Sequence, residues 1–313
     1  MADQKALGVL FGVAAGAMWA VETILGKIML SSLSFIQVTA SEAFFATITA
    51  FVYILLSGES LKIKDASLMD ILSVGLIGTV LAPLIYFFGL TLTFAVNAAL
   101  IAHLQPLFVS IFGFFFLKER MHKHDVIGGA LIGLAVILIT GRTLDNIVNF
   151  KLGNIGDLVV LLATMGWALV AIPGKRLTRH VSSATIVGYR FLVASTIFLP
   201  LLLFMNQLVI ESIYQVLLGI TVGLGYIFYY EGLKRIKAGQ VALTELSSPF
   251  FAAILAWVLL GEYTTIIQIV GASLLMAGLV ILTRENSASD LNINSVKVSR
   301  LQPELRKRLL NYF

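Results

Sequence analysis

Five ionisable side chains lie inside long apolar stretches of the sequence, where a charged group is costly. They are Glu22, Glu42, His103, Arg190 and Glu245. A charge at the centre of a bilayer costs about 3 kcal/mol or more, so such residues are kept for function or are paired. A carboxylic acid at such a position can bind an organic cation or carry a proton, because burial favours its protonated form. These five residues are therefore the first candidates for chemistry.

Glu22 shares one face of a predicted helix with Ala15, Trp19 and Gly26, at steps of four, three and four residues. An organic cation would pair with the Glu22 carboxylate and with the face of the Trp19 indole. We therefore predict Trp19 and Glu22 as substrate-binding residues, and Glu22 as a candidate for proton coupling. The alternative is that Glu22 is hydrated near a membrane surface.

His103 and Glu245 lie at similar depths in two other apolar stretches. Two titratable groups at such a depth can line a cavity and exchange a proton. Both are predicted substrate-binding residues, and Glu245 is the second candidate for proton coupling. The alternatives are a histidine that is satisfied within the helix bundle and a helix-to-helix hydrogen bond from Glu245.

Two prolines interrupt the apolar stretches. Pro106 and Pro249 each remove a backbone hydrogen bond within a helix and are predicted hinges, with a static kink as the alternative. The remaining predicted substrate-binding side chains are polar or aromatic neighbours of these stretches: Tyr86, Gln105, Trp167, Tyr229 and Ser248. Asn97 and Gln240 stand where two stretches begin and are predicted helix caps or interfacial groups.

Glu42 and Arg190 occupy equivalent positions in two apolar stretches. Each lies about 12 Å along its helix at 1.5 Å per residue, which is close to the midplane of a bilayer. Opposite charges at that depth predict a structural ion pair, and contact with substrate is the alternative.

The elements that must position these residues are apolar runs, each near the length of about 20 residues that a spanning helix needs. Ten of them cover residues 6–26, 34–56, 68–92, 96–117, 125–141, 156–173, 182–204, 212–233, 239–260 and 265–283. The chain of 313 residues is 58% hydrophobic and 12% charged, whereas soluble domains carry about 25% charged residues. We therefore predict an all-α polytopic membrane protein with ten transmembrane helices in a lipid bilayer.

The sequence contains an internal repeat. Residues 85–141 align with residues 228–284 at a constant shift of 143, so that Pro106 meets Pro249. A looser copy at a shift of 148 pairs Trp19 with Trp167. We predict two five-helix repeats, at residues 1–148 and 149–285, and a polar basic tail at residues 286–313.

The distribution of Lys and Arg residues predicts how the chain is oriented in the membrane. With both termini in the cytoplasm, the inner segments hold 18 of the 22 basic residues and the outer loops hold 3. The link KERMHKHD then lies inside, while its repeat counterpart GEYTT lies outside. Homologous halves with opposite charge bias indicate inverted repeats.

Several motifs together resemble a known family. The first run of each half carries a Trp and ends in Gly-Lys (GAMWAVETILGK and GWALVAIPGK). The fourth run of each half has a Pro and ends in LKE or LGE, and YRFLVAS stands in the seventh run. In this order and in two copies, the motifs resemble the EamA-type permeases of the drug/metabolite transporter superfamily over residues 1–285. The resemblance implies a central cavity lined by the first, third, fourth, sixth, eighth and ninth helices, and export of small metabolites.

We therefore predict a secondary transporter that exports an amino acid, an amine or another cationic compound across the plasma membrane by alternating access, with a proton as a candidate coupled ion. The alternatives are a passive facilitator or channel of the same fold, and a carrier of sugar phosphates or nucleotide sugars. No catalytic or metal-ligating motif, Walker A sequence or dinucleotide turn is present in the sequence, so we predict no enzyme, cofactor, metal site or nucleic-acid partner. The Gly-rich runs GGALIG and GASLLMAG predict packing surfaces, within the chain or between protomers of a homodimer.

Overall fold

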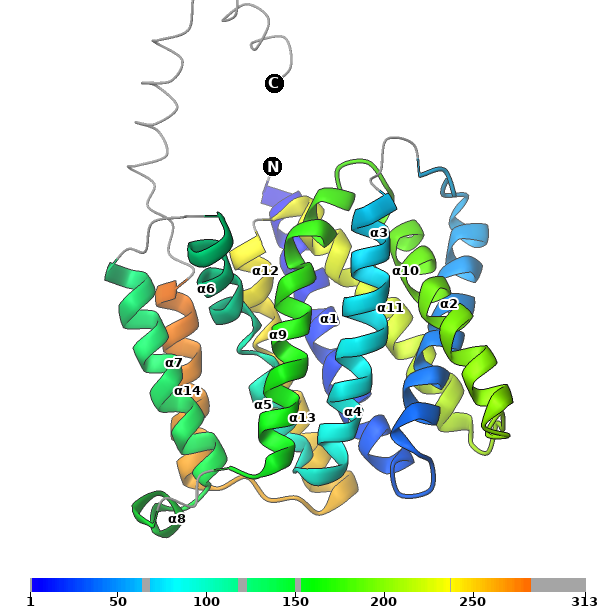
Figure 1. The fold of residues 1–313 in the computed structure, drawn as a ribbon. Coiled ribbons are helices and arrows are strands. Elements are labelled where there is room, and N and C mark those ends of the chain that lie inside the picture. Colours follow the sequence, from blue (N-terminus) through cyan, green and yellow to red (C-terminus); the bar gives the residue numbers. More distant parts are fainter. Residues whose placement is uncertain (1, 64–67, 118–122, 150–152, 237, 283–313) are drawn as a thin grey trace, which may run out of the picture. The chain divides into compact units, whose positions relative to one another are not determined.

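The computed structural model describes residues 2–63, 68–117, 123–149, 153–236 and 238–282, and every regular element in these ranges is a helix (Figure 1). The predicted tail at residues 286–313 and most of the link KERMHKHD lie outside the described residues. The bundle that ends at Leu282 forms one compact unit.

The helices of the first half of the chain are α1 (Ala2–Met29), α2 (Phe35–Ser57), α3 (Leu68–Gly75), the π-helical segment η1 (Leu76–Leu81), α4 (Ala82–Leu92), α5 (Ala95–Ala102), α6 (Gln105–Leu117), α7 (Lys123–Gly141) and the short α8 (Leu144–Val148). Those of the second half are α9 (Ile155–Leu177), α10 (Ser183–Phe204), α11 (Ile213–Arg235), α12 (Ala238–Glu245), α13 (Ser248–Leu260) and α14 (Ile266–Leu282).

Among the described residues, seven helical stretches are long and apolar enough to cross a membrane. They are Gln4–Met29, Phe35–Ser57, Leu68–Leu92, Ile155–Leu177, Ser183–Phe204, Ile213–Arg235 and Leu243–Leu260. Three shorter apolar helices, Ala95–Val109, Val126–Gly141 and Ile266–Ile281, accompany them. The all-helical membrane class is thereby confirmed, and ten crossings stay a prediction.

Two apolar segments are broken helices, and the breaks fall at equivalent places. α5 and α12 begin and end 143 residues apart, and α6 and α13 do the same. Pro106 and Pro249 each stand at the second residue of α6 or α13, a position that proline tolerates because its missing N–H would have had no partner there. Each of these two apolar runs is thus broken just before its proline, and the hinge role of Pro106 and Pro249 stays a prediction.

A π-helical turn precedes α4 and frees a backbone acceptor. The N–H of Ala82 donates to the carbonyl of Ile77, five residues back. The carbonyl of Gly78, four residues before Ala82, is therefore left for other donors. Pro83, the next residue, has no N–H to offer. Such π turns recur at functional sites.

The two halves interlock through their first helices. α1 packs along α11, α12 and α13 of the second half, and α9 packs along α3, α4, α5 and α6 of the first half. α7 and α14 lie side by side (Figure 1). A Cβ at Gly278 would lie 2.9 Å from the Gly128 carbonyl oxygen, so these glycines pack α14 on α7 within one chain.

The closest approach of α2 and α11 depends on a glycine. A Cβ at Gly219 would lie 2.2 Å from the Phe45 Cβ and 2.7 Å from the Ala46 backbone nitrogen. By contrast, a Cβ at Gly133 on α7 would meet no atom within 4 Å.

Candidate functional site

A chain of polar and aromatic contacts runs through the middle of the bundle, starting at Trp19 of α1. The Trp19 Nε1–H donates to Glu245 Oε1 at 2.7 Å, at the end of α12. The Trp19 ring also packs edge-on against Tyr226 of α11, with ring centroids 4.7 Å apart. Trp19 thereby connects the predicted acid Glu245 with a tyrosine that the sequence analysis did not single out.

The contacts continue from α1 through α4 to α9. Thr23 donates to the Trp19 carbonyl at 3.0 Å and shares a 2.7 Å hydrogen bond with the Tyr86 hydroxyl. The Tyr86 ring lies 5.3 Å from the Trp167 ring. The Trp167 Nε1–H donates to the Gly78 carbonyl oxygen at 3.1 Å, which is the acceptor that the π turn frees.

Arg190 of α10 closes this loop of contacts. Its NH2 donates to the Gly78 carbonyl at 3.0 Å, its Nε to Thr79 Oγ1 at 2.8 Å and its NH1 to the Tyr230 hydroxyl at 3.3 Å. Its guanidinium carbon lies 3.8 Å above the centre of the Tyr226 ring. We call the closed set of Trp19, Thr23, Tyr86, Trp167, Gly78, Arg190 and Tyr226 the central ring.

Two buried carboxyl groups share the electrostatic environment of the central ring. Glu22 is 8% exposed and interacts electrostatically with Arg190. Glu42 is 2% exposed and interacts electrostatically with both Glu22 and Arg190. The Arg190 guanidinium donates to Thr79, Gly78 and Tyr230, and among the described residues it forms no hydrogen bond or ion pair with Glu42. Glu42 and Arg190, predicted to form an ion pair, therefore interact electrostatically without direct contact.

The other predicted site residues gather around the two helix breaks. His103 follows α5, and its Nδ1 lies 2.7 Å from the Ala99 carbonyl, with the Glu245 backbone also within hydrogen-bonding reach of the ring. Gln105 donates to the Trp167 carbonyl at 3.4 Å. Ser248 is buried, and its Oγ has no hydrogen-bond partner among the described residues.

Tyr229, the repeat counterpart of Tyr86, does not enter the central ring. Its ring packs edge-on against Tyr230 at 5.3 Å and Tyr226 at 6.4 Å. Sequence reasoning missed Tyr226 and Tyr230, whose signal is the spacing of three tyrosines in YIFYY at residues 226–230. It also missed Thr23 and Thr79, because isolated threonines in apolar helices commonly bond their own backbone.

A second polar network lies where α5 and α9 begin. Asn97, predicted as a cap or interfacial group, is instead 1% exposed. Its Nδ2 donates to Asp157 Oδ1 at 3.2 Å, and its Oδ1 accepts from Gln268 Nε2 at 2.7 Å. Asp157 also accepts from Thr93 Oγ1 at 2.5 Å. These bonds join α5, α9 and α14, so that this end of the bundle is tied together by buried side chains.

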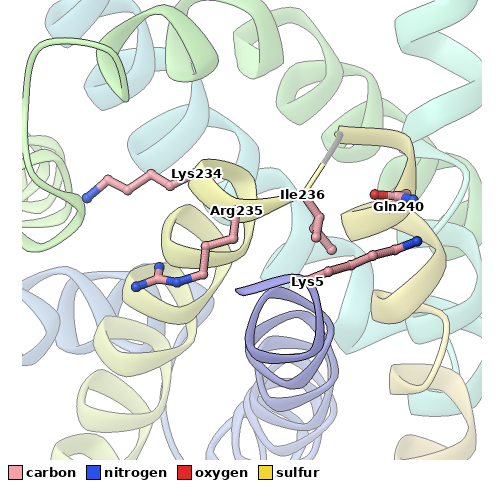
Figure 2. Close-up of a pocket in the computed structure, with 5 residues that line it drawn as sticks. All are labelled: Lys5, Lys234, Arg235, Ile236 and Gln240. Atoms are coloured by element: carbon pink, nitrogen blue, oxygen red, sulfur yellow. The ribbon is translucent and has the colours of Figure 1, made fainter. Parts of the chain in front are cut away.

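A shallow basic pocket lies at the opposite end of the bundle, where α1 begins and α11 ends. Its volume is about 450 Å³, and its lining residues are Lys5, Lys234, Arg235, Ile236 and Gln240 (Figure 2). The Lys5 side chain extends toward Gln240, whereas Lys234 and Arg235 point the other way (Figure 2). Glu231 pairs with both Lys234 and Arg235. Within the described ranges, no cluster of three or more acidic or His side chains could hold a metal ion.

Apolar helices able to cross a bilayer, with buried charges and aromatic rings gathered between them, define a polytopic membrane protein. The model of the EamA-like transporter family matches residues 6–141 and again residues 154–284. This chain therefore belongs to the EamA-like transporter family and is a membrane transporter.

Individual relatives agree with this assignment. An uncharacterized transporter of Methanothermobacter thermautotrophicus is 32% identical over 72% of this chain and 67% of its own length. A probable amino-acid metabolite efflux pump of Salmonella typhimurium is 28% identical over 59% of this chain and 66% of its own length. A solved structure described only as "Crystal structure of protein" superposes with a TM-score of 0.64 at 20% identity, over 88% of this chain and 96% of that one, which shows the shared fold.

Proposed function

We propose that this protein is a secondary transporter that carries a small organic solute with an amine or another cationic group across the plasma membrane by alternating access. The observation that carries the proposal is the composition of the central ring and the acids beside it. Glu22, Glu42 and Glu245 bring three carboxyl groups to this region, and Arg190 is the only guanidinium bonded into the ring in the described part of the chain.

The aromatic rings of the central ring also support a cationic solute. Trp19, Tyr86 and Trp167 lie on helices from both halves of the chain, and Trp19 is bonded to the Glu245 carboxyl group. A cation over such rings gains about 0.5–2 kcal/mol in addition to its attraction to a carboxylate. The name of the Salmonella relative, a probable amino-acid metabolite efflux pump, fits a solute with an amino group and export as the direction.

We further propose that ten helices cross the membrane as two inverted five-helix repeats, residues 1–148 and 149–285. Three observations support this: the family model matches once in each half, the breaks before α6 and α13 are 143 residues apart, and the first helix of each half packs within the other half. Inverted repeats of this kind support alternating access, because the halves can exchange their conformations about a central site.

The topology can be tested by side-specific labelling, because the chain has no cysteine. His124→Cys, at the start of α7, and Tyr263→Cys, before α14, should react with a membrane-impermeant maleimide from opposite sides of sealed vesicles. The same test places the termini, which we propose are cytoplasmic. Reaction of both cysteines from one side would overturn the inverted arrangement.

The transport proposal requires flux measurements in proteoliposomes. A thermal-shift screen of amines and amino acids on the purified protein identifies a ligand, because a ligand that binds the folded state raises its stability. We then expect Glu22→Gln and Glu245→Gln to lower the flux of that ligand driven by a pH gradient at least tenfold, and the exposed-surface control Glu211→Gln to leave it unchanged. Wild-type flux in both acid variants would remove these carboxyl groups from the mechanism.

One observation favours a second candidate, a carrier of anionic solutes such as sugar phosphates. Lys5, Lys234 and Arg235 line the pocket at the end of the bundle, and Glu231 offsets only one of their three positive charges, so the remaining charge would attract an anion there (Figure 2). Stabilisation of the protein by phosphorylated sugars rather than by amines in the same screen would favour this candidate. A passive facilitator would instead show flux that no pH gradient changes.

A further inference from the structure

Lys27, near the end of α1, is bonded to the end of α4. Its Nζ donates to the carbonyl oxygens of Leu90 at 2.7 Å and Thr93 at 2.5 Å. Thr93 is the C-cap of α4 and Leu90 lies in its last turn, where helical carbonyls lack partners and a cation is favoured. We call these two bonds the Lys27 contact. It joins α1 and α4 at one end of the bundle.

The internal repeat gives Lys27 a counterpart that makes no such contact. Lys175 of α9 stands 148 residues after Lys27, at the shift that relates the first helices of the two halves. Its side chain is exposed, and its Nζ bonds to none of the described residues. Two lysines at equivalent positions therefore differ in their state.

The second half nevertheless has the acceptors that an equivalent contact would use. The carbonyls that correspond to the two acceptors of Lys27, at a shift of 143 residues, are those of Leu233 and Ile236 at the end of α11. Ile236 has φ −130° and ψ 166°, close to the φ −133° and ψ 173° of Thr93. The two helices thus end in the same backbone conformation, with a lysine bonded to only one of them among the described residues.

Two equivalent glycines show how closely the helices approach in each half. A Cβ at Gly26 of α1 would lie 2.4 Å from Cε1 of Phe87 on α4. The counterparts are Gly174 of α9 and Tyr230 of α11, and there a Cβ would lie 3.9 Å from Cε1 and 3.4 Å from the hydroxyl oxygen. Helix α1 therefore lies closer to α4 at this point than α9 lies to α11.

The broken helices show the same asymmetry. α5 packs against α1 and α13. The counterpart pairs, α12 with α9 and α12 with α6, do not pack to a comparable extent among the described residues. The bundle is therefore closed at the end of the Lys27 contact and more open at the other end, where the basic pocket lies.

We propose that Lys27 and Lys175 act in turn during alternating access. This structure has the Lys27 contact formed, and in the opposite-facing state Lys175 makes the equivalent contact at the end of α11 while Lys27 is released. The inference rests on the inverted repeats and alternating access of the proposed function, because halves of like sequence can exchange their conformations. It requires neither a cationic solute nor a proton. Both lysines are positioning residues that act on helices and not on the solute.

The exchange of one contact for the other keeps the two states close in free energy. Each contact consists of charge-assisted hydrogen bonds from a lysine to two backbone carbonyls at a helix end. Each state forms one contact and releases the other, so neither state is favoured by the total. Only such a balance lets a bound solute shift the population between the states.

Distances between spin labels measure this exchange without any solute. The chain has no cysteine, so labelled cysteines can be introduced in pairs. Ser31 and Thr91 are exposed near the Lys27 contact and form the first-half pair. Their repeat counterparts Arg179 and Lys234 are exposed at the other end and form the second-half pair. Electron paramagnetic resonance on the purified protein in detergent gives the distance distribution of each pair.

Lys27→Met should raise the ratio of the opposite-facing state to the present state at least tenfold. Its first-half pair should move apart and its second-half pair should move together, whereas Lys175→Met should not populate the opposite-facing state. The control Lys62→Met removes an exposed lysine from the loop between α2 and α3 and should change neither distribution. An unchanged second-half pair in Lys27→Met, or equal shifts in Lys27→Met and Lys175→Met, would overturn the proposal.

Glycine substitutions test the exchange without removing a lysine. Gly26→Ala places a Cβ against Phe87, so it should separate α1 from α4 and favour the opposite-facing state. Gly174→Ala has room in this state but opposes a closer approach of α9 to α11, so it should favour the present state. These variants replace Lys27→Met if that protein is not monodisperse. Opposite effects of the two alanines support the proposal, and equal effects or none overturn it.

The result can be separated from the fate of the proposed solute. Reciprocal shifts in the lysine variants, with no stabilisation by amines or amino acids in the ligand screen, would retain the two contacts and reject the cationic solute. Flux of an amine, with distance distributions that no lysine or glycine variant changes, would retain the transporter and reject the two contacts.

Discussion

Replacing Glu262 by alanine should loosen the start of α5, a helix that lies far from it in the sequence. Phe94 precedes α5 and has no side-chain oxygen with which to cap it. The backbone N–H groups of Ala95 and Val96 donate instead to Glu262 Oε1 at 3.1 Å and Oε2 at 3.3 Å. The carboxylate therefore caps the helix from the loop between α13 and α14, in the other half of the chain.

The expected size of the effect follows from these two bonds. Loss of a helix cap costs about 1 kcal/mol, and loss of a negative charge at the helix N-terminus costs about 0.3–1 kcal/mol more. Glu262→Ala should therefore lower the free energy of unfolding by about 1–2 kcal/mol. Glu262→Gln keeps an acceptor oxygen but loses the charge, so it should cost about half as much.

Thermal unfolding of the purified protein in detergent can measure this difference. At about 2–4 °C for each kcal/mol, Glu262→Ala should lower the apparent Tm by about 2–8 °C, with Glu262→Gln in between. Glu211→Ala, which removes an exposed acid from the loop between α10 and α11, is the matched control and should leave Tm unchanged. The reasoning is refuted if Glu262→Ala melts with the wild type, or if Glu262→Gln is as unstable as Glu262→Ala.

Two further sites give predictions for the same assay. Gly219→Ala should cost about 2 kcal/mol or more, because the added Cβ has no room between α2 and α11, whereas Gly133→Ala, with open space around it, should be neutral or stabilise α7 by about 0.5 kcal/mol. Equal melting of the two variants would contradict the close approach. Asn97→Ala should cost about 2 kcal/mol, because it leaves Asp157 and Gln268 with fewer partners in a buried network; Asn97→Asp, which cannot donate to Asp157, should not restore stability.

The breaks between α5 and α6 and between α12 and α13 were partly predictable from the sequence. Pro106 and Pro249, read alone, predict interruption of a helix, and their repeat predicts that it occurs twice at one depth. The structure breaks both helices just before the proline, 143 residues apart, while the hinge role and the common depth stay predictions. A proline does not reveal whether its helix bends or ends, because that depends on what the preceding turn packs against. Here α5 packs against α9 and α1, and α12 packs against α1.

The partners of Glu42 and Arg190 could not be predicted from the sequence. Their equivalent positions and opposite charges predict a direct pair, and both side chains are buried. The structure gives the arginine other partners, because the π turn before α4 presents the Gly78 carbonyl and Thr79 to it. No periodic pattern in the sequence predicts a π turn. The free carbonyl of Gly78 could therefore not be predicted.

By itself, the sequence determined the class of the protein, because the length and apolar character of the helices leave only a bilayer as their solvent. It also revealed the internal repeat and singled out most of the acids of the candidate site, since a charge in an apolar helix is costly. The tertiary structure alone decided which of these groups meet. Contacts such as Trp19 with Glu245 and Arg190 with Tyr226 join residues on different helices, and their geometry depends on how close the helices approach and how each is turned about its axis.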